Sequence, residues 1–415
     1  MRTDRDILHC DANNFYASVE MCKDPSLRGK NIAVCGDPEK RHGIVLAKSE
    51  GAKALGVKTG DTVREAKQKC PDLLFLRPDF DSYLRYSRAL FDIYTSYTDR
   101  VESFGLDECW LDVKGSHSLF GPSEKIAEEI RRRAREELGL TLSVGISFTK
   151  VFAKLGSDLK KPDAQTVIDR DNYQKIAWGL PVEDILMVGR SAKHFFHSVG
   201  ILTIGDLAKA DAKLLQKSLG QTGLTLRDWA GGIEDDEVKM YYERRVPESV
   251  GNGATAERDL HTRAESNAFI TALAERVAAR LRRKNLHCCG VMLTLKYNDL
   301  STVGKQMKTV YPTASATDIT DMAMKIYDEL QSGKDRLPIR AITVTAIYLF
   351  QADDYAQTSL LGEQTSSEKH TRLEKSIDLI RQKYGAEAIT RGNLMKDIFD
   401  IEENCEEEAK PFYRQ

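Results

Sequence analysis

Acidic residues at the ends of two short apolar stretches constrain the fold of this chain more than any other feature. Asp11 ends an apolar run that begins at Ile7, and the doublet Asp107-Glu108 lies within a second strand-like stretch, 101–112. Carboxylates at the rim of a sheet are unfavourable unless cations pair with them. Three carboxylates from two strands can hold two divalent ions and leave positions open for phosphates. The alternative, a salt-bridged surface cluster, is disfavoured because both stretches lack lysine and arginine.

Length and composition indicate a soluble protein of several domains. A chain of 415 residues is too long for one core, so we expect two to four domains. No apolar run is long enough to span a bilayer, and the start of the chain lacks the apolar segment of a secretory signal. The eight cysteines form no Cys-x-x-Cys pair, so we expect reduced thiols in a cytoplasmic protein.

The net charge of −2 conceals an asymmetry along the chain. The segment from residue 353 onward holds 14 acidic and 9 basic residues. Subtracting these from the totals of 63 acidic and 61 basic residues leaves 49 and 52 in residues 1–352, a net charge of +3. A slightly basic body weakly favours a nucleic-acid partner.

Strand-like and helix-like patterns alternate over the first 170 residues and predict a mixed α/β sheet domain. The helix predicted over 79–98 carries an apolar face, and Ser123 is the predicted N-cap of a second helix, 123–138. A third helix is expected over 150–159. Strands are predicted over 7–11, 31–35, 44–47, 73–76 and 140–146.

Residues 171–238 are rich in helix and turn glycines, and the segment from Gly189-Arg190 onward looks like a helix-hairpin-helix. In such a hairpin, backbone amides at a glycine turn meet a DNA phosphate without reading the base. Met187 stands where the first glycine of the turn is expected. An ordinary pair of antiparallel helices remains the alternative.

A polar linker, 239–250, precedes a β-α-β-β-α-β pattern that predicts a small independent domain over 251–352. Helices are expected over 264–284 and 316–331, and strands over 291–297 and 339–349. The first helix places a group of its basic residues close together, which favours contact with phosphates over a merely solvated face. These are Arg276, Arg280, Arg283 and Lys284. In the acidic tail, a helix over 373–384 has apolar residues spaced to pack against a neighbour.

Three motifs occur together in one order: Asp11-x-x-x-Phe-Tyr-Ala-x-Val-Glu, Leu-Asp107-Glu108-x-x-Leu-Asp, and Ser-Val-Gly-Ile-Ser followed by Lys-x-x-Ala-Lys and Lys-Pro. In this combination the chain resembles the Y-family translesion DNA polymerases over roughly residues 6–350. The resemblance implies a multidomain α/β (α+β) right hand. Its parts are a palm (1–16 and 78–170), fingers (17–77), a helical thumb (171–238), a little finger (251–352) and an acidic tail (353–415).

The resemblance also implies a catalytic centre. Asp11 and Asp107 would bridge two Mg²⁺ ions, and Glu108 would hold the ion that activates the primer 3′-hydroxyl. The backbone carbonyl of Ala12 would complete the ion on the nucleotide side. Two ions suit this chemistry because an in-line displacement needs both its attacking and its leaving oxygen stabilised.

Further residues are expected to select and hold the deoxynucleoside triphosphate. Tyr16 resembles the steric gate of the family, in which a ring under the sugar excludes a 2′-hydroxyl; a core aromatic is the alternative. The amides of Phe15 and Tyr16, at a helix N-terminus, could hold triphosphate oxygens. Lys161 matches a lysine that contacts the triphosphate from the palm, with Lys160 as the neighbouring alternative.

The fingers depart from the family pattern Thr-x-x-Tyr-x-x-Arg, which clasps the triphosphate. The matching positions are Ala47, Glu50 and Lys53. Lys53 keeps the charge but lacks the fork of arginine, and Glu50 is expected to point away or to pair with Lys48 or Lys53. Small residues in short fingers imply a loose lid, and hence low fidelity and bypass of damaged template bases.

The tail segment 357–361 resembles the peptide by which bacterial polymerases bind the sliding clamp, with Gln357, Leu360 and Leu361 as its anchors. The expected partners are primer–template DNA, deoxynucleotides and this clamp, for a monomer at the nucleoid with no membrane contact. Two alternatives are open. A nucleotide cyclase would share a two-metal palm but would have no duplex to hold, and a non-catalytic, clamp-bound accessory protein would not need an intact triphosphate clasp.

Overall fold

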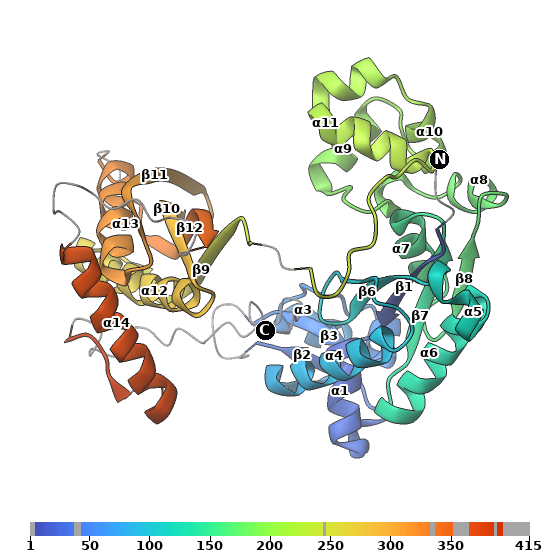
Figure 1. Cartoon of the computed structure of the whole chain (residues 1–415), viewed down its shortest axis with the longest axis horizontal. Helices are drawn as coiled ribbons and strands as arrows, with labels where there is room; N and C mark the ends of the chain where they lie inside the picture. Colours follow the sequence, from blue (N-terminus) through green and yellow to red (C-terminus); the bar gives the residue numbers. More distant parts are fainter. Residues whose placement is uncertain are drawn as a thin grey trace. The chain divides into compact units, whose positions relative to one another are not determined.

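The computed structural model describes residues 5–36, 43–243, 246–332, 337–351, 365–385 and 388–392. They form two compact units that divide after Glu243 (Figure 1). The division falls inside the range predicted as a linker, 239–250. None of the helices among the described residues is long and apolar enough to cross a membrane.

The sheet that carries the predicted acidic residues has five strands in the order β5-β6-β1-β7-β8. Its central strand, β1 (Ile7–Ala12), is buried along its whole length. β1 pairs antiparallel with β6 (Glu108–Asp112) and with β7 (Leu142–Ser147). The edge strands are β5 (Val101–Ser103), antiparallel to β6, and β8 (Gln165–Ile168), parallel to β7.

Four helices cover this sheet: α1 (Phe15–Lys23), α4 (Phe80–Thr95), α6 (Ser123–Leu138) and α7 (Lys150–Leu159). Because side chains alternate along β1, its residues divide between the two faces. Leu8 and Cys10 belong to the core formed with α1, α4 and α6, whereas Ile7 packs against Ala153 of α7 on the opposite face. The helices predicted over 123–138 and 150–159 are confirmed.

The predicted N-cap of α6 was wrong. Pro122 holds the N-cap position, and Ser123 is the first helical residue. The Ser123 hydroxyl instead lies 3.1 Å from His117 Nε2. His117 begins the short helix α5 (His117–Phe120), which follows the 3-10 turn η2 (Lys114–Ser116).

Helix α7 lies unusually close to β7. A Cβ atom on Gly145 of β7 would stand 1.8 Å from the Ala153 carbonyl oxygen, and a Cβ on Gly156 would stand 3.1 Å from the Gly145 Cα. The absence of a side chain at Gly145 therefore permits backbone-to-backbone contact. This contact brings Lys154 and Ser157 of α7 within reach of β1.

The range predicted as fingers contains a small sheet in the order β3-β2-β4, with its strands within one residue of the expected positions. A short apolar core that includes Val45, Ala52 and Val57 holds this sheet and its helices together. The elements are η1 (Pro25–Leu27), β2 (Ile32–Cys35), β3 (Val45–Lys48), α2 (Glu50–Ala54), α3 (Val63–Lys69) and β4 (Leu74–Leu76).

The range predicted as thumb is helical, and its apolar core continues into α7 through Phe152. Gly189 is the N-cap of α9, and Met187 before it has a positive φ of 70° and is 68% exposed. The turn thus needs the left-handed backbone that glycine adopts most easily, at the position where the hairpin pattern expects one. The elements are α8 (Tyr173–Ala177), η3 (Val182–Asp184), α9 (Arg190–Ser198), α10 (Ile204–Lys209) and α11 (Ala212–Ala230), which is kinked at Gly220.

The second unit confirms the predicted β-α-β-β-α-β order. Its sheet has the strand order β11-β10-β12-β9, all antiparallel, and α12 and α13 bury their apolar faces against it. The elements are β9 (Ser249–Leu260), α12 (Arg263–Arg283), β10 (Leu286–Tyr297), β11 (Thr302–Thr313), α13 (Ala316–Leu330) and β12 (Ile339–Gln351).

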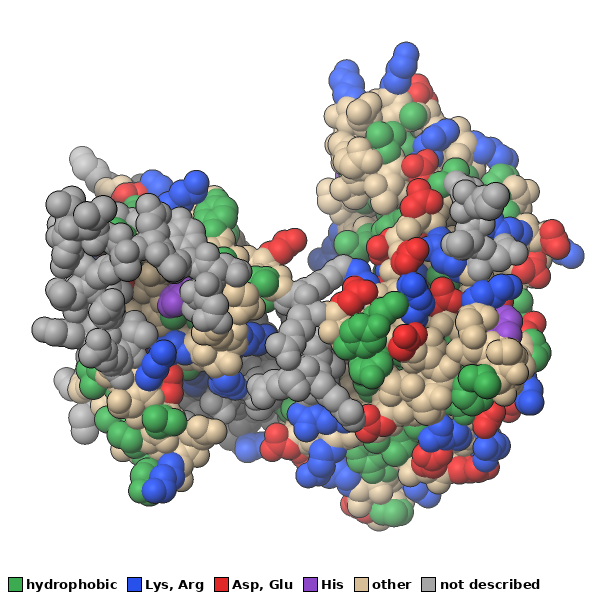
Figure 2. Space-filling view, in the orientation of Figure 1, with side chains coloured by type: hydrophobic (Ala, Val, Ile, Leu, Met, Phe, Trp, Pro, Cys, Tyr) green, Lys and Arg blue, Asp and Glu red, His purple; other side chains and the backbone are tan. Residues whose placement is uncertain are grey.

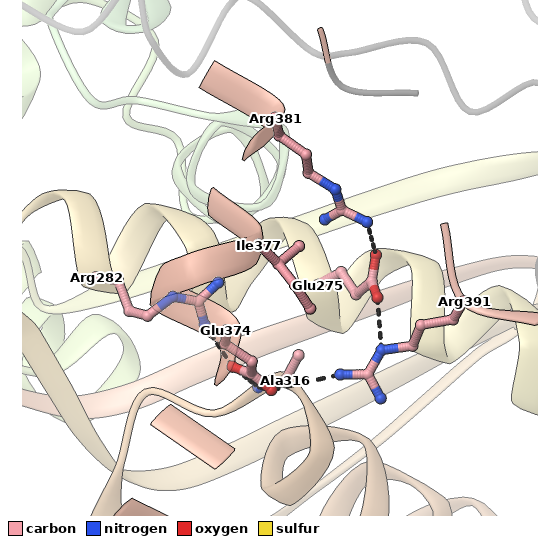
Figure 3. Close-up of a pocket in the computed structure, with 7 residues that line it drawn as sticks. All are labelled: Glu275, Arg282, Ala316, Glu374, Ile377, Arg381 and Arg391. Atoms are coloured by element: carbon pink, nitrogen blue, oxygen red, sulfur yellow. Dashed lines mark hydrogen bonds and ion pairs between the residues drawn. The ribbon is translucent and has the colours of Figure 1, made fainter. Parts of the chain in front are cut away.

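Helix α14 (Thr365–Tyr384) of the tail docks on α12 and α13 through charged side chains (Figure 3). Arg282 of α12 forms a two-pronged pair with Asp378, at 2.6 and 2.9 Å, and also donates to Glu374 at 2.6 Å. Glu374 in turn accepts from the amide of Ala316 at the start of α13. The side chains of Arg282 and Glu374 are only 8% and 5% exposed.

A second set of ion pairs also orients the tail helix, and here the carboxylate belongs to α12 and the arginines belong to the tail. Glu275 of α12 accepts from Arg381 at 3.0 Å and from Arg391 at 2.6 Å. The predicted apolar packing of this helix was wrong for Leu373 and Leu379, which are 60% and 66% exposed. Ion pairs are therefore the main contacts that hold the described part of α14 on α12 and α13.

We predict that Arg282→Met destabilises the second unit by about 3 kcal/mol, because the buried Glu374 and the partly exposed Asp378 would both lose their ion pair with this arginine. The measurement is urea unfolding of the full chain, followed by hydrogen exchange in α14. Lys305→Met is the control, since its pair with Glu329 is half exposed and should contribute less than about 1 kcal/mol. Equal, small effects of both substitutions would contradict this account of tail docking.

Candidate active site

Asp11 and Glu108 face each other across the ladder between β1 and β6. The Ala12 amide donates to the carbonyl oxygen of Asp107 at 3.0 Å. This bond extends the pairing by one residue before the start of β6. His9 and Asp11 point to the same face because side chains alternate along β1. Ligand atoms of His9, Asp11 and Glu108 all lie within 4.8 Å of one another. Two of the three predicted carboxylates are therefore neighbours in space.

Asp107 lies beside this group rather than within it. One of its carboxylate oxygens stands 3.2 Å from the position of a Cβ atom on Gly105. Burial, and then the charges of Glu108 and Asp11, raise the pKa of Asp107 to about 7. The three carboxylates thus interact electrostatically, and ionising all of them without a cation is unfavourable.

Two lysines from outside both acidic motifs converge on Asp11. Lys154 Nζ lies 2.9 Å from Asp11 Oδ2 and 3.0 Å from Glu108 Oε2. Lys161 Nζ lies 2.7 Å from the same Asp11 oxygen, and Asp158 pairs with both lysines. The two acidic motifs contain no lysine or arginine, but α7 and the turn after it supply two lysines that form ion pairs with their carboxylates. Lys154 is the last residue of the Lys-x-x-Ala-Lys motif. The sequence analysis gave it no role, because its contacts depend on how α7 packs.

Charge pairing keeps Glu108 ionised in spite of its burial. Burial raises the pKa of Glu108, but His9 and Lys154 outweigh it and bring this pKa to about 2. Burial lowers the pKa of His9, which favours a neutral imidazole. Burial lowers the pKa of Lys154 as well, but Asp11 and Glu108 raise it above its usual value. The site therefore combines anionic oxygens with two ammonium groups.

The donor set fits a hard divalent cation. Asp11 and Glu108 supply the carboxylate oxygens that Mg²⁺ prefers. Glu108 Oε2 is buried and has no hydrogen-bond partner among the described residues, since Lys154 contacts it as an ion pair without hydrogen-bond geometry. A buried carboxylate oxygen that accepts no hydrogen bond can still bind a cation, and a cation site requires such an oxygen.

Tyr16 is fixed by its neighbours. Its ring stacks on that of Tyr83 at 4.4 Å between centroids and 20° between planes, and its edge meets Phe80 at 6.0 Å. Tyr83 is fully buried, and its hydroxyl donates to Glu20 at 2.7 Å. A ring held in this way keeps its position when a ligand binds next to it. Phe15 begins α1 and is buried beside Tyr16.

The fingers contact the start of α1 through Glu50. Its carboxylate accepts from Asn14 Nδ2 at 2.7 Å and lies 3.5 Å from Lys53 Nζ. Pairing with Lys53, one of the two predicted arrangements, is confirmed, whereas Lys48 instead donates to Thr59. Lys53 is half exposed on α2, so its ammonium remains accessible to a ligand.

The residues predicted to contact DNA lie in both units. Gly189 and Arg190 lie at the start of α9. The other predicted DNA contacts, Arg276, Arg280, Arg283 and Lys284, lie along the second half of α12 and just after it. Arg280 donates to the Gly251 carbonyl oxygen at 3.1 Å, while Arg283 and Lys284 are exposed. On the face drawn in Figure 2, basic and acidic side chains are interspersed over the first unit. The predicted clamp-binding residues, 357–361, lie outside the described residues.

Comparison with known proteins identifies close relatives. The impB/mucB/samB family model matches residues 10–158, and the model of that family's C-terminal domain matches residues 247–360. A DNA polymerase IV of Acetivibrio thermocellus is 44% identical over 394 residues, which cover 95% of this chain and 98% of that protein. DNA polymerase IV 1 of Bacillus subtilis is 35% identical and covers 94% of both chains.

The fold also has a solved counterpart. A Y-family DNA polymerase chimera built from Dbh and Dpo4 superposes with a TM-score of 0.73 at 23% sequence identity. The match covers 83% of this chain and 99% of the chimera. At this identity the likeness shows the fold, a right hand of palm, fingers, thumb and little finger.

We predict that Asp107→Asn stabilises the metal-free protein at pH 8 by about 4 kcal/mol. The folded pKa of about 7 exceeds the ordinary value of 3.8, so the ionised carboxylate is unfavourable in the folded state above pH 7. This cost shrinks as the pH falls from 7 towards 4, and the stabilisation should shrink with it. Thermal unfolding in a chelator at pH 8 and pH 5 measures the effect. Asp171→Asn, at an exposed site, is the control, and the same shift in both variants would refute the prediction.

Proposed function

The chain belongs to the Y family of DNA polymerases, and from this premise we propose that it extends primers by two-metal-ion nucleotidyl transfer on damaged templates. The observation that carries the proposal is the pairing of Asp11 with Glu108 across β1 and β6, with Asp107 adjacent. Metal-dependent, DNA-directed synthesis of DNA is the activity of this family. Low fidelity and a part in translesion synthesis are the finer elements of the proposal.

The carboxylates are proposed to hold two Mg²⁺ ions. Asp11 and Asp107 would bridge them, Glu108 would bind the ion near the primer, and the Ala12 carbonyl would serve the ion near the nucleotide. Bound there, Mg²⁺ would lower the pKa of the primer 3′-hydroxyl and neutralise charge on the leaving pyrophosphate. The raised pKa of Asp107 supports this assignment, because burial and then the charges of Glu108 and Asp11 disfavour its ionised form, and a bound cation would favour it.

The lysines are proposed to bind the anionic nucleotide. Lys161 Nζ lies 2.7 Å from Asp11, so its ammonium stands next to the proposed ions, where the triphosphate must also lie. Phe15 and Tyr16 amides, in the first turn of α1, would add hydrogen-bond donors. Lys53 from the fingers would contribute charge without the bidentate geometry of arginine.

Selection of the sugar is assigned to Tyr16. Its ring is stacked on Tyr83 and cannot easily move aside for a 2′-hydroxyl. The fingers present small side chains such as Ala47 and Gly51, and few contacts would then test the shape of the nascent base pair. This looseness is the physical basis for the proposed low fidelity and lesion bypass.

We predict that Asp107→Ala or Glu108→Ala slows nucleotide addition about 10³-fold or more, because several kcal/mol of charge stabilisation are lost. Single-turnover primer extension with Mg²⁺ and dNTPs measures the rate, and fluorescence anisotropy measures binding of primer–template DNA. DNA affinity should stay close to that of the wild type. Asp171→Ala is the control, and near-normal extension by either active-site variant would disprove the assignment.

We predict that Tyr16→Ala lowers discrimination against ribonucleotides at least about 10-fold, because the obstruction below the sugar disappears. The quantity to measure is the ratio of kcat/KM for dNTP and the matching rNTP. Tyr86→Ala, at another partly buried tyrosine of the same core, is the matched control. If sugar selection is unchanged in Tyr16→Ala, that ring is a core aromatic and not a gate.

The bacterial sliding clamp is the proposed protein partner, bound through Gln357, Leu360 and Leu361. We predict that changing Leu360 and Leu361 together to alanine abolishes stimulation of synthesis by the clamp and leaves basal synthesis intact. Extension on primed circular DNA with and without loaded clamp tests this. Changing Leu373 and Leu379 of α14 together to alanine is the control. Full stimulation of the 360/361 variant would exclude this peptide as the docking site.

A further inference from the structure

A negative charge of the fingers stands beside the proposed nucleotide site. Glu50 Oε1 accepts a hydrogen bond from Asn14 Nδ2 at 2.7 Å. Asn14 directly precedes Phe15, whose backbone amide is one of the donors proposed for the triphosphate. A carboxylate and a triphosphate repel each other, so the position of Glu50 at this edge of the site has a cost for nucleotide binding.

The side chain of Asn14 contacts the fingers instead of capping its own helix. Asn14 is the N-cap residue of α1 and has a positive φ of 48°, a conformation that asparagine tolerates better than most residues. An asparagine at this position usually accepts a hydrogen bond from an amide of the first helical turn. The Asn14 side chain makes no such bond within the described part of the chain. Its amide group is therefore committed to Glu50.

The backbone next to Glu50 is fixed, which places the origin of its side chain near α1. Ser49 is the N-cap residue of α2 and is buried. Its hydroxyl donates to the Lys30 carbonyl oxygen at 3.1 Å and accepts from the Ile32 amide at 3.1 Å. The start of α2 is thus tied to β2 and to the residues before it, so the contact with Asn14 is built into the fingers.

The carboxylate oxygen that accepts from Asn14 also pairs with Lys53. Lys53 Nζ lies 3.5 Å from Glu50 Oε1, about one turn further along α2. Lys48, the other cation predicted as a partner of Glu50, instead donates to Thr59 at 2.9 Å. The lysine that the fingers are proposed to offer to the triphosphate therefore already has an anionic partner.

We propose that Glu50 limits the affinity of the site for nucleotides, because an incoming triphosphate must take Lys53 from its carboxylate. The inference rests on the proposed function of this site in binding a deoxynucleoside triphosphate. The side chains of Lys53 and Glu50 are 47% and 46% exposed, so the lysine can exchange one anion for the other without any change in the core.

The effect should be the same for matched and mismatched nucleotides. Lys53 would contact the phosphates, which all four nucleotides share, and not the base. An interaction present both before and during the reaction changes the dissociation constant of the nucleotide and not the rate of the chemical step. Glu50 is therefore expected to set the concentration of nucleotide that the enzyme needs, and not its choice of base.

A purely structural role of Glu50 is the alternative. An acidic residue in the first turn of a helix is favourable, and the bond to Asn14 joins the fingers to α1. Glu50→Gln separates the two roles, because glutamine loses the charge but keeps an acceptor for Asn14. Glu65→Gln is the matched control. Glu65 lies in the first turn of α3 and forms a capping box with Thr62, which glutamine can also form.

The measurement is single-turnover primer extension by the full chain over a range of dNTP concentrations, which separates the Kd of the nucleotide from the maximal rate. We expect Glu50→Gln to lower the Kd about 3-fold, as the loss of one half-exposed ion pair allows, with little change in the maximal rate. Matched and mismatched dNTPs should respond equally. The gain should shrink at high salt, which screens the charges involved. Glu65→Gln should leave the Kd unchanged.

A double-mutant cycle tests whether Glu50 acts through the lysine. Lys53→Gln alone should raise the Kd of the nucleotide, because the triphosphate loses a cation. When Lys53 has already been replaced, Glu50→Gln should lose most of its effect, since the carboxylate no longer has a lysine to withhold. Thermal unfolding of each variant checks that the fingers remain folded.

An unchanged or higher Kd in Glu50→Gln would overturn the inference. An equal gain with and without Lys53, or an equal gain in Glu65→Gln, would overturn it as well. The proposed function would survive each of these results, because it is tested by extension with the wild type and its loss in Asp107→Ala. If the wild type added no nucleotide to a primer, the proposed function would fail, and the role of Glu50 would fail with it.

Discussion

The backbone contact between α7 and β7 is the constraint on which the site depends. Gly145 leaves room for the Ala153 carbonyl, which a Cβ atom would approach to 1.8 Å. Only at this distance can one helix place Lys154 against Asp11 and Ser157 against His9. The proposed active site is therefore built from two layers, in which the strands supply carboxylates and the helix supplies the groups that pair with them.

The charges of the carboxylates and of the two lysines explain why this site is suited to binding a divalent ion. Three carboxylates lie at the ends of adjacent strands, and burial together with their mutual repulsion raises the pKa of Asp107. Lys154 and Lys161 offset part of this repulsion and stand where a triphosphate would need positive charge. Lys161, which pairs with Asp11 without ligands, is also the lysine proposed to bind the nucleotide. Energy stored as unfavourable ionisation at Asp107 favours the uptake of a divalent ion.

The sequence predicted the elements well where a pattern is local. Helices 123–138 and 150–159 follow from their 3.6-residue periodicity, and the strands that carry Asp11 and Glu108 follow from short apolar runs. The pairing of these two residues depends on the order of the strands. Lys154, Ser157 and His9 could not be grouped in advance, because their contacts depend on the order of strands and on a close helix approach. The docking of α14 was misjudged for a similar reason. Its apolar spacing suggested a hydrophobic face, but the partner surface offers Arg282 and Glu275, and long-range charge pairing leaves no periodic signal.

The central claim is that the carboxylates of β1 and β6 form a two-ion polymerase centre. The most direct measurement is the number of Mn²⁺ ions bound per chain in a ternary complex with a dideoxy-terminated primer and the correct dNTP, counted by electron paramagnetic resonance. The account predicts two ions in the wild type and a loss of both in Asp11→Ala, because that residue is assigned to bridge them. Binding of fewer than two ions by the wild type, or of two ions by Asp11→Ala, would contradict it.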